Sequence, residues 1–193
     1  MMMWKFAHTP ATLVLGGVLA MASAPVLAQQ ALIPAQSEIV FVSKQMGVPV
    51  EGRFKKFDAQ VSFDAARLAS SKISLTIDTG SASLSKEAEA ELPKPVWFNV
   101  AKFPQATFHS TAIKSVGAGK YEVAGKLSIK GASQDVVIPV ALAQNGATTT
   151  ATGSFAIKRL TFKIGENEWA DTSMVADEVQ VKFKLALSGI SGI

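Results

Sequence analysis

The feature that most constrains this chain is a strand-like alternation of apolar and polar residues from Tyr121 to Leu187. Residues 121–130 place tyrosine, valine, leucine and isoleucine on one face and lysine, glutamate and serine on the other. Residues 175–187 repeat the pattern. A sheet with one hydrophobic face must bury that face. A chain with few helical segments does so by closing the sheet into a barrel or by stacking two sheets as a sandwich. Only a barrel leaves a ready internal cavity, so this choice decides the function.

The first 28 residues have the layout of a secretory signal peptide. Lys5 provides a basic start, an apolar stretch runs from Thr12 to Ala24, and Val26-Leu-Ala28 is a small-residue cleavage site. The alternative is an uncleaved anchor, but the apolar stretch is short of the roughly 20 residues that a spanning helix needs. Because no cysteine stands at the cleavage point, we expect no lipid anchor. We therefore expect an exported protein, cleaved near Ala28, with one domain over residues 29–193.

Charge and cysteine content narrow the class of protein further. The chain has 19 lysines and arginines, one of them in the leader, against 15 acidic residues. This dispersed excess is too weak for a nucleic-acid-binding protein, whose basic residues cluster on one face. It instead favours a peripheral contact with an anionic lipid surface. The chain has no cysteine, so an exported domain of this size has to be stabilised by its core rather than by disulfides.

The pattern predicts about eight strands and one short helical excursion in a single all-β domain. The helix is expected over Ser85–Leu92, capped by Ser83 or Ser85 and ended by two prolines. Gly52 marks a bend or a close approach of another group within the second strand. The predicted strands have period two and short turns between them, and they are 37–45, 50–63, 73–78, 107–113, 121–130, 136–142, 149–158 and 175–187.

Beyond the leader the sequence offers little for catalysis. His109 is the one histidine left, and because its neighbour Phe108 carries the apolar face, we expect His109 to face solvent without a catalytic partner. A metal site without cysteine would need to be nearly all carboxylate. Glu166, Glu168 and Asp171 cluster near Trp169, which a polar loop explains. We find neither a nucleophile elbow nor a phosphate-binding glycine loop, and we predict no catalytic residue, metal or cofactor.

The aromatic residues are compatible with two kinds of barrel interior. Ten of the eleven phenylalanines lie beyond the leader, and they are spread over nearly every predicted strand and connection. Most of them are expected to fill an ordinary core. An eight-stranded barrel, however, is wide enough either to be packed with side chains or to hold one slim ligand. The sequence by itself does not separate a packed barrel from a hollow one.

Several stretches, taken in order from about Gln36 to Leu187, resemble the YceI-like family of periplasmic lipid-binding proteins. The stretches are Ser37-Glu-Ile-Val-Phe41, Val50-Glu-Gly-Arg-Phe-Lys-Lys-Phe57, Val61-Ser-Phe-Asp64, Trp97-Phe98, Phe103-Pro-Gln-Ala-Thr-Phe-His-Ser110, Gly125-Lys-Leu-Ser-Ile-Lys-Gly131 and Ile157-Lys-Arg-Leu-Thr-Phe-Lys-Ile-Gly165. The resemblance implies a periplasmic, extended, lipocalin-like antiparallel β-barrel without catalysis, which encloses a polyisoprenoid lipid or an isoprenoid quinone in an apolar tunnel. Many members have a histidine where this chain has Gln45, whose amide can donate and accept hydrogen bonds.

We predict that large residues on the apolar strand faces line the tunnel. Arg159 has the strand parity of Phe155 and Ile157, so we expect it to point inward. A buried guanidinium needs a partner, and we favour Asp171 over the head group of a ligand because an unpaired buried charge is so costly. The predicted ligand-binding residues are Phe41, Gln45, Phe57, Phe63, Ile77, Trp97, Phe98, Phe108, Leu127, Ile129, Phe155, Arg159, Phe162, Val181 and Phe183.

Two other functions stay open at this point. The first is a structural or stress-related barrel with a packed interior, which acts through protein partners. The second is a lipid-modifying enzyme, for which His109 would be the base at neutral pH. The sequence also leaves open whether two barrels pair as a homodimer.

Overall fold

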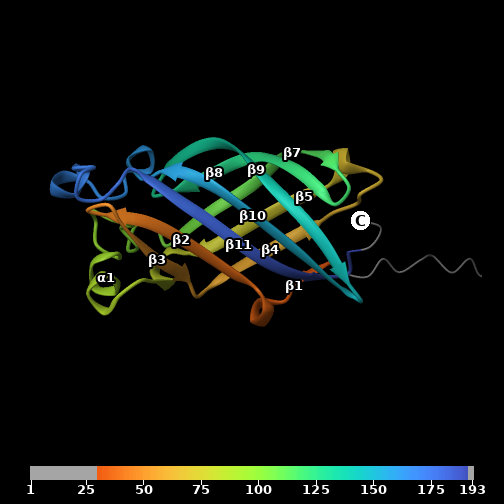
Figure 1. Ribbon diagram of the computed structural model, residues 1–193, viewed down its shortest axis with the longest axis horizontal. Coiled ribbons are helices and arrows are strands. Elements are labelled where there is room, and N and C mark those ends of the chain that lie inside the picture. Colours follow the sequence, from red (N-terminus) through yellow and green to blue (C-terminus); the bar gives the residue numbers. More distant parts are fainter. Residues whose placement is uncertain (1–29, 191–193) are drawn as a thin grey trace, which may run out of the picture.

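One antiparallel sheet curls around a long axis in the computed structural model of the protein (Figure 1), which describes residues 30–190. Hydrogen-bonded neighbours follow the order β4-β5-β7-β8-β9-β10-β11-β2-β3-β6, and β1 also pairs with β11. The strands are β1 (Ala31–Leu32), β2 (Glu38–Gln45), β3 (Val48–Phe54), β4 (Phe57–Ser62), β5 (Lys72–Asp78), β6 (Ala82–Ser83), β7 (Gln105–Gly117), β8 (Lys120–Ile129), β9 (Ala132–Asn145), β10 (Thr148–Lys158) and β11 (Glu178–Ser188).

The predicted all-β, lipocalin-like antiparallel fold is confirmed, with more strands than the eight expected. The predicted strand over 50–63 is two strands, β3 and β4, interrupted at Lys55 and Lys56. The backbone of this interruption bonds outside both strands, since Lys55 N donates to Ser81 O and Lys56 O accepts from Asp78 N. As a result, β3 and β4 lie near opposite ends of the ladder instead of forming one strand. The two-residue strands β1 and β6 have too little sequence to show a period.

The helical excursion is also confirmed. Helix α1 (Lys86–Glu91) begins after Ser85, whose side chain accepts a hydrogen bond from Ala88 N at 3.2 Å, so Ser85 is the cap rather than Ser83. Figure 1 shows α1 at one end of the curled sheet, together with the connections that follow β10. The described residues also form short 3₁₀ turns, which are η1 (Pro34–Gln36), η2 (Leu68–Ser70), η3 (Thr79–Ser81), η4 (Arg159–Phe162) and η5 (Asn167–Ala170).

Backbone pairing alone does not close the barrel. Within residues 30–190 the end strands of the ladder, β4 and β6, pair with β5 and β3 and not with each other. The side chain of Gln30 partly replaces the missing pairing, because its amide donates to Phe63 O and accepts from Phe63 N, both at 2.7 Å. Gln30 precedes β1, which contacts β4. The sheet is therefore a half-barrel whose remaining gap is bridged in part by one amide side chain.

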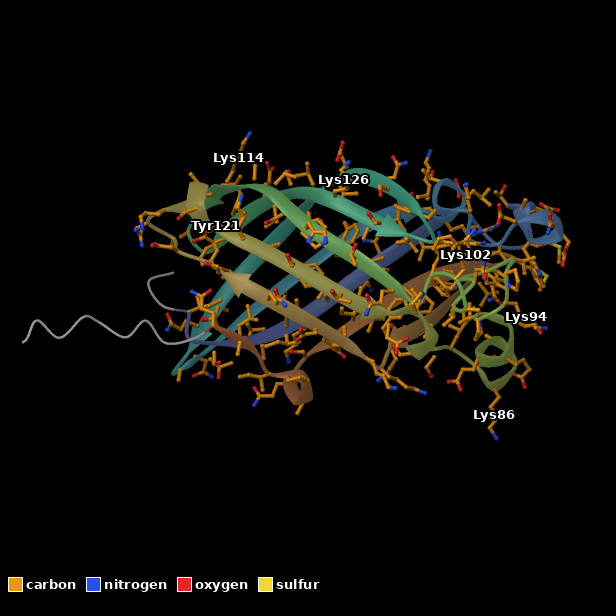
Figure 2. The ribbon with its side chains drawn as sticks, turned by 180° about the vertical axis from the view of Figure 1, so that it is seen from behind. Lys86, Lys94, Lys102, Lys114, Tyr121 and Lys126 are labelled. Atoms are coloured by element: carbon orange, nitrogen blue, oxygen red, sulfur yellow. The ribbon has the colours of Figure 1, made fainter. Side chains whose placement is uncertain are left out.

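The hydrophobic core follows the concave side of the sheet. At the end away from α1, the rings of Phe63 and Tyr121 meet edge to face, with 5.2 Å between their centroids. Figure 2, seen from behind, places Tyr121 at the opposite end of the molecule from Lys86 and Lys94. The interior thus runs between an aromatic end and an end covered by α1. No helix within the described residues is long and apolar enough to cross a membrane.

Candidate functional site

The concave side of the sheet encloses two cavities that share part of their walls. The inner cavity, of about 140 Å³, lies between the strands, and its lining residues are all hydrophobic. The outer cavity, of about 480 Å³, is lined by α1, β2 and the connection between β10 and β11. Ile129, Ile157 and Val181 line both cavities. The two cavities therefore meet at these residues, and we call them together the bore.

Most of the predicted tunnel residues lie on the wall of this bore. The inner cavity is lined by Phe63, Ile77, Phe108, Leu127, Ile129, Phe155, Val181 and Phe183, and the outer cavity by Phe41, Gln45, Trp97, Phe98, Ile129, Arg159 and Val181. The placement of those in the strands follows from strand parity, since directly opposed residues such as Phe155 and Val181 share a face. Trp97, Phe98 and Arg159 lie outside the strands.

Two predicted residues line neither cavity. Phe57 is opposed to Ile77 in the ladder but stands at the start of an end strand, where only one neighbouring strand supports it. Phe162 lies in the turn η4 and is buried in the core without reaching the bore. Its strand-like parity in the sequence does not apply there, because β10 ends at Lys158.

Other lining residues could have been found from the same pattern, and some could not. Tyr121 and Val123 share the parity of Leu127 and line the inner cavity with it. Trp169 and Met174, on the outer cavity, come from irregular connections that have no period to read.

Glycines in the strands give space to aromatic rings on the wall. A Cβ atom at any of three strand glycines would lie only 2.3 or 2.4 Å from the ring of a neighbouring phenylalanine. Each ring therefore occupies the space that a side chain at the glycine would fill. Part of the ring's volume thus lies against the wall instead of in the bore. The pairs are Gly52 with Phe41, Gly125 with Phe108 and Gly153 with Phe183.

Arg159 is buried at the wall of the outer cavity, with only 2% of its surface exposed. All of its guanidinium nitrogens donate to backbone carbonyls of the segment that follows it in the chain. Burial lowers the pKa of Arg159, and the negative charge of Asp177 partly opposes this shift. The acceptors are Ala176 O at 3.1 Å, Ile164 O at 2.9 Å, Gly165 O at 3.0 Å, Trp169 O at 2.6 Å and Val175 O at 2.6 Å.

The predicted tie between Arg159 and Asp171 is wrong. The Asp171 carboxylate instead accepts from Ser173 N at 2.9 Å and Ser173 Oγ at 2.7 Å, and it is exposed. These bonds lower the pKa of Asp171. Carbonyl oxygens satisfy the guanidinium because the chain turns around it after β10 ends, which a strand pattern does not reveal.

A second buried cation holds the same segment, residues 159–177, which we call the strap. The side chain of Lys130 is 4% exposed and donates to Lys163 O at 2.5 Å and to Glu166 Oε2 at 2.9 Å. A Cβ atom at Gly165 would lie 2.3 Å from Arg159 Nη1, so only glycine fits there. Together, the two cations fix the strap over the end of the sheet, where it forms one wall of the outer cavity.

The polar side chains of the bore lie in the outer cavity. They belong to Ser43, Gln45, Ser85, Glu87, Glu91 and Arg159. Hydrogen bonds from its own backbone N–H and from Ser85 lower the pKa of Glu87, so its carboxylate stays charged at the edge of the cavity. The bore thus has a dry inner part and a mixed outer part.

Two tryptophans face each other at this outer part. The rings of Trp97 and Trp169 are 5.4 Å apart, with 46° between their planes, and both line the outer cavity. Trp97 Nε1 is buried and has no hydrogen-bond partner within residues 30–190. Both indoles therefore form part of the wall of the outer cavity.

His109 is exposed, as predicted, although it does have a partner. Its Nδ1 lies 3.0 Å from Ser74 Oγ on the neighbouring strand β5. Its neighbour Phe108 lines the inner cavity, which puts His109 on the outer face of the sheet. A histidine there does not reach the bore. The described part of the chain also has no group of three or more acidic or histidine residues that could hold a metal ion.

Relatives with similar sequences match about half of this chain. The UPF0312 protein of Ectopseudomonas mendocina is 40% identical over 88 residues, which cover 45% of this chain and 46% of the relative. Protein YceI of Salmonella arizonae is 35% identical over 96 residues, covering 49% of this chain and 50% of the relative. The chain thus spans about half the length of the curated relatives that it matches.

Solved structures extend the similarity over most of the chain. The crystal structure of Burkholderia cenocepacia BcnA has a TM-score of 0.78 at 50% identity, covering 80% of this chain and 98% of that one. A polyisoprenoid-binding domain from Saccharophagus degradans, implicated in plant cell wall breakdown, has a TM-score of 0.67 at 15% identity, covering 83% of this chain and 98% of that one. At that identity the likeness shows the fold alone.

A family model described as a YceI-like domain matches residues 31–187, which include all strands but the last residue of β11. This match includes the walls of both cavities except for Ile190. The chain therefore belongs to the YceI-like family.

Proposed function

We propose that this protein binds one polyisoprenoid lipid or isoprenoid quinone in the bore, for transport or storage and without catalysis. The observation that carries the proposal is the bore itself, in which a wholly hydrophobic inner cavity adjoins a mixed outer cavity. An amphipathic lipid has the same division into a long apolar tail and a polar head. The tail is assigned to the inner cavity and the head to the outer cavity, near Gln45.

The energetics of burial support such a ligand. Each buried methylene contributes about 0.8 kcal/mol, so a five-carbon isoprene unit contributes a few kcal/mol. Several units together exceed an association cost of roughly 4–15 kcal/mol. Binding would therefore depend on the length of the tail, and no strong polar anchor is needed.

Two further observations support binding over the alternatives. The interior keeps cavities of about 140 and 480 Å³, which does not agree with a barrel packed by its own side chains. His109 lies on the outer face of the sheet, away from any lipid in the bore. The structural neighbour from Saccharophagus degradans, described as polyisoprenoid-binding, has the same fold.

We place this activity in the periplasm, because the first 28 residues read as a signal peptide. There the protein would shield an isoprenoid tail from water. A peripheral contact with a membrane would allow the lipid to enter and leave.

The proposal is tested by native mass spectrometry and lipid extraction of the mature protein purified from the periplasm. We expect a co-purifying isoprenoid in the wild-type protein. Val181→Phe adds bulk where the two cavities meet and should abolish lipid occupancy, since the tail could no longer pass. Val137→Phe is the matched control, because Val137 lies in β9 and is 59% exposed.

Thermal unfolding of both variants shows whether the fold is kept, since overpacking costs about 1–3 kcal/mol where space is lacking. A wild-type protein that is empty after purification and does not take up an added isoprenoid quinone would overturn the proposal. If the two folded variants held the same amount of lipid, the bore would not be the binding site. Fluorescence of Trp97 and Trp169, both on the outer cavity, follows the uptake of added quinone.

A further inference from the structure

Three of the most exposed large hydrophobic side chains lie together at one edge of the outer cavity. They belong to Met46, Val48 and Met174, which are 78%, 63% and 46% exposed, and we call them the rim. Met46 and Met174 also line the outer cavity, and Met46 N donates to Met174 O at 2.8 Å. Two apolar side chains of the rim, Met46 and Met174, are therefore both exposed at the surface and part of the wall of the bore.

The turn that carries Met46 does not explain the presence of a methionine. Met46 and Gly47 connect β2 to β3 as a two-residue turn, in which Gln45 is opposed to Val48. Both turn residues have positive φ, 48° at Met46 and 81° at Gly47. Asparagine and glycine suit such a turn, whereas a long side chain is disfavoured in the left-handed region. A methionine that is both disfavoured by its backbone and exposed to water contributes little to folding.

We propose that the rim inserts into the lipid layer of a membrane and joins the bore to it. This inference rests on the proposed function, because the cargo would be a lipid that dissolves in membranes and not in water. A rim embedded among lipid tails would let the cargo pass between membrane and outer cavity along Met46 and Met174 without crossing water. A flexible, unbranched methionine suits a path that must adapt to a moving chain.

The size of the rim favours a lipid layer over a protein partner. A stable protein interface buries about 1,200–2,000 Å² in total, far more than three side chains can supply. Insertion of a few apolar side chains at a membrane surface needs no such area. Figure 1 shows the β2–β3 turn at the same end of the molecule as α1, which lines the outer cavity, so the rim lies at the outer end of the bore.

The charges around this end favour insertion over attraction to anionic lipid. Lysines and acidic residues alternate there and pair, as in Lys94 with Glu91 at 2.5 Å and Lys130 with Glu166 at 2.9 Å. Figure 2 shows Lys86 and Lys94 projecting near α1, whose sequence also holds three glutamates. Such a balanced surface neither repels nor strongly attracts a charged membrane. We therefore expect the rim to insert into a neutral lipid surface, and we expect this membrane binding to depend little on salt concentration.

The test is flotation of the mature protein with phosphatidylcholine vesicles at low and high salt. We expect the wild-type protein to bind under both conditions and Met46→Asn to weaken binding about tenfold or more. Asparagine suits the left-handed turn, so the melting temperature should not fall. Val137→Asn is the matched control, since this exposed valine lies away from the rim, and it should bind as the wild type does.

A second measurement separates this inference from the proposed function. Val48→Asn is the variant for this measurement, because Val48 belongs to the rim but lines neither cavity. Loading of an isoprenoid quinone from detergent solution should be the same for the wild type and Val48→Asn, whereas extraction from vesicles should slow about tenfold in the variant. Failure to load from detergent defeats the proposed function. Normal loading from detergent, together with equal rates of extraction from vesicles in both proteins, would contradict the proposed role of the rim.

Two other outcomes would also overturn the inference. Binding that needs anionic vesicles and disappears at high salt would mean attraction by charge. Sedimentation velocity that shows a dimer lost in Met46→Asn, without vesicle binding, would mean that the rim joins two copies of the chain.

Discussion

The inner cavity and the strap are stabilised in different ways. Hydrophobic residues from the strands line the inner cavity. The free energy gained by burying them depends on the apolar area removed from water and little on how the side chains are oriented. The strap is held by Arg159 and Lys130, which donate hydrogen bonds at fixed positions while buried. A buried donor or acceptor that loses its partner costs more than a lost methylene. The strap should therefore tolerate substitution less well than the inner wall does.

Arg159→Ala is expected to have the largest effect and tests this comparison directly. It would leave five backbone carbonyls of the strap without their donor in a buried place. We expect a loss of about 3–5 kcal/mol in the free energy of unfolding, measured by urea denaturation. Arg159→Lys should recover only part of it, because three ammonium donors do not match the planar fork of a guanidinium.

Asp171→Asn is the control for Arg159→Ala. The Asp171 side chain is exposed, and within the described residues its carboxylate accepts hydrogen bonds only from Ser173, so its substitution should change the free energy of unfolding by no more than about 0.5 kcal/mol. Arg159→Ala should also lower stability more than lipid uptake. Unchanged melting with lost uptake would instead assign Arg159 to the ligand.

The wall of the bore offers the next largest effect. Gly52→Ala would place a Cβ atom 2.3 Å from Phe41 Cζ and so push the ring into the outer cavity. We expect a loss of about 1–3 kcal/mol from overpacking, together with weaker uptake of lipid. The double variant Gly52→Ala/Phe41→Leu should recover part of the stability, because leucine lacks the ring atoms that collide.

A double-mutant cycle of the two substitutions measures this coupling. Two effects that simply add would contradict direct packing of the Phe41 ring against Gly52. The backbone oxygen of Ser83, 2.9 Å from the same Cβ position, limits how complete the recovery can be.

The same comparison explains which parts of the site could be predicted from the sequence. A period of two ties a residue to a face, so Leu127, Phe155 and Val181 were placed on the wall by parity alone. Tyr121 and Val123 follow the same rule and line the inner cavity with Leu127, so their parity also carried the signal. In the strands, therefore, local pattern and final position agree.

Prediction was less complete where the chain leaves the strands, although Trp97 and Phe98 line the outer cavity as expected. Arg159 was correctly expected to be buried, but its partners are carbonyls of a connection whose path no period describes. Met46 stands in a turn position where sequence preference favours other residues, so its place at the rim carried no signal. Directional bonds and irregular backbone thus decide the outer part of the site.

Apart from the controls, Thr149→Val is expected to have the smallest effect. It tests whether an apolar side chain stabilises the dry end of the interior better than threonine does. Thr149 is fully buried, is opposed to Leu187 of the inner cavity, and its hydroxyl has no hydrogen-bond partner within the described residues. Valine keeps the shape and removes the unsatisfied hydroxyl, so we expect a gain of about 0.5–1 kcal/mol in urea denaturation. Thr150→Val, on the opposite face of β10 and half-buried, should change little. A loss of stability in Thr149→Val would mean that the hydroxyl has a partner in solution, and the dry end would then depend on directional bonding as the strap does.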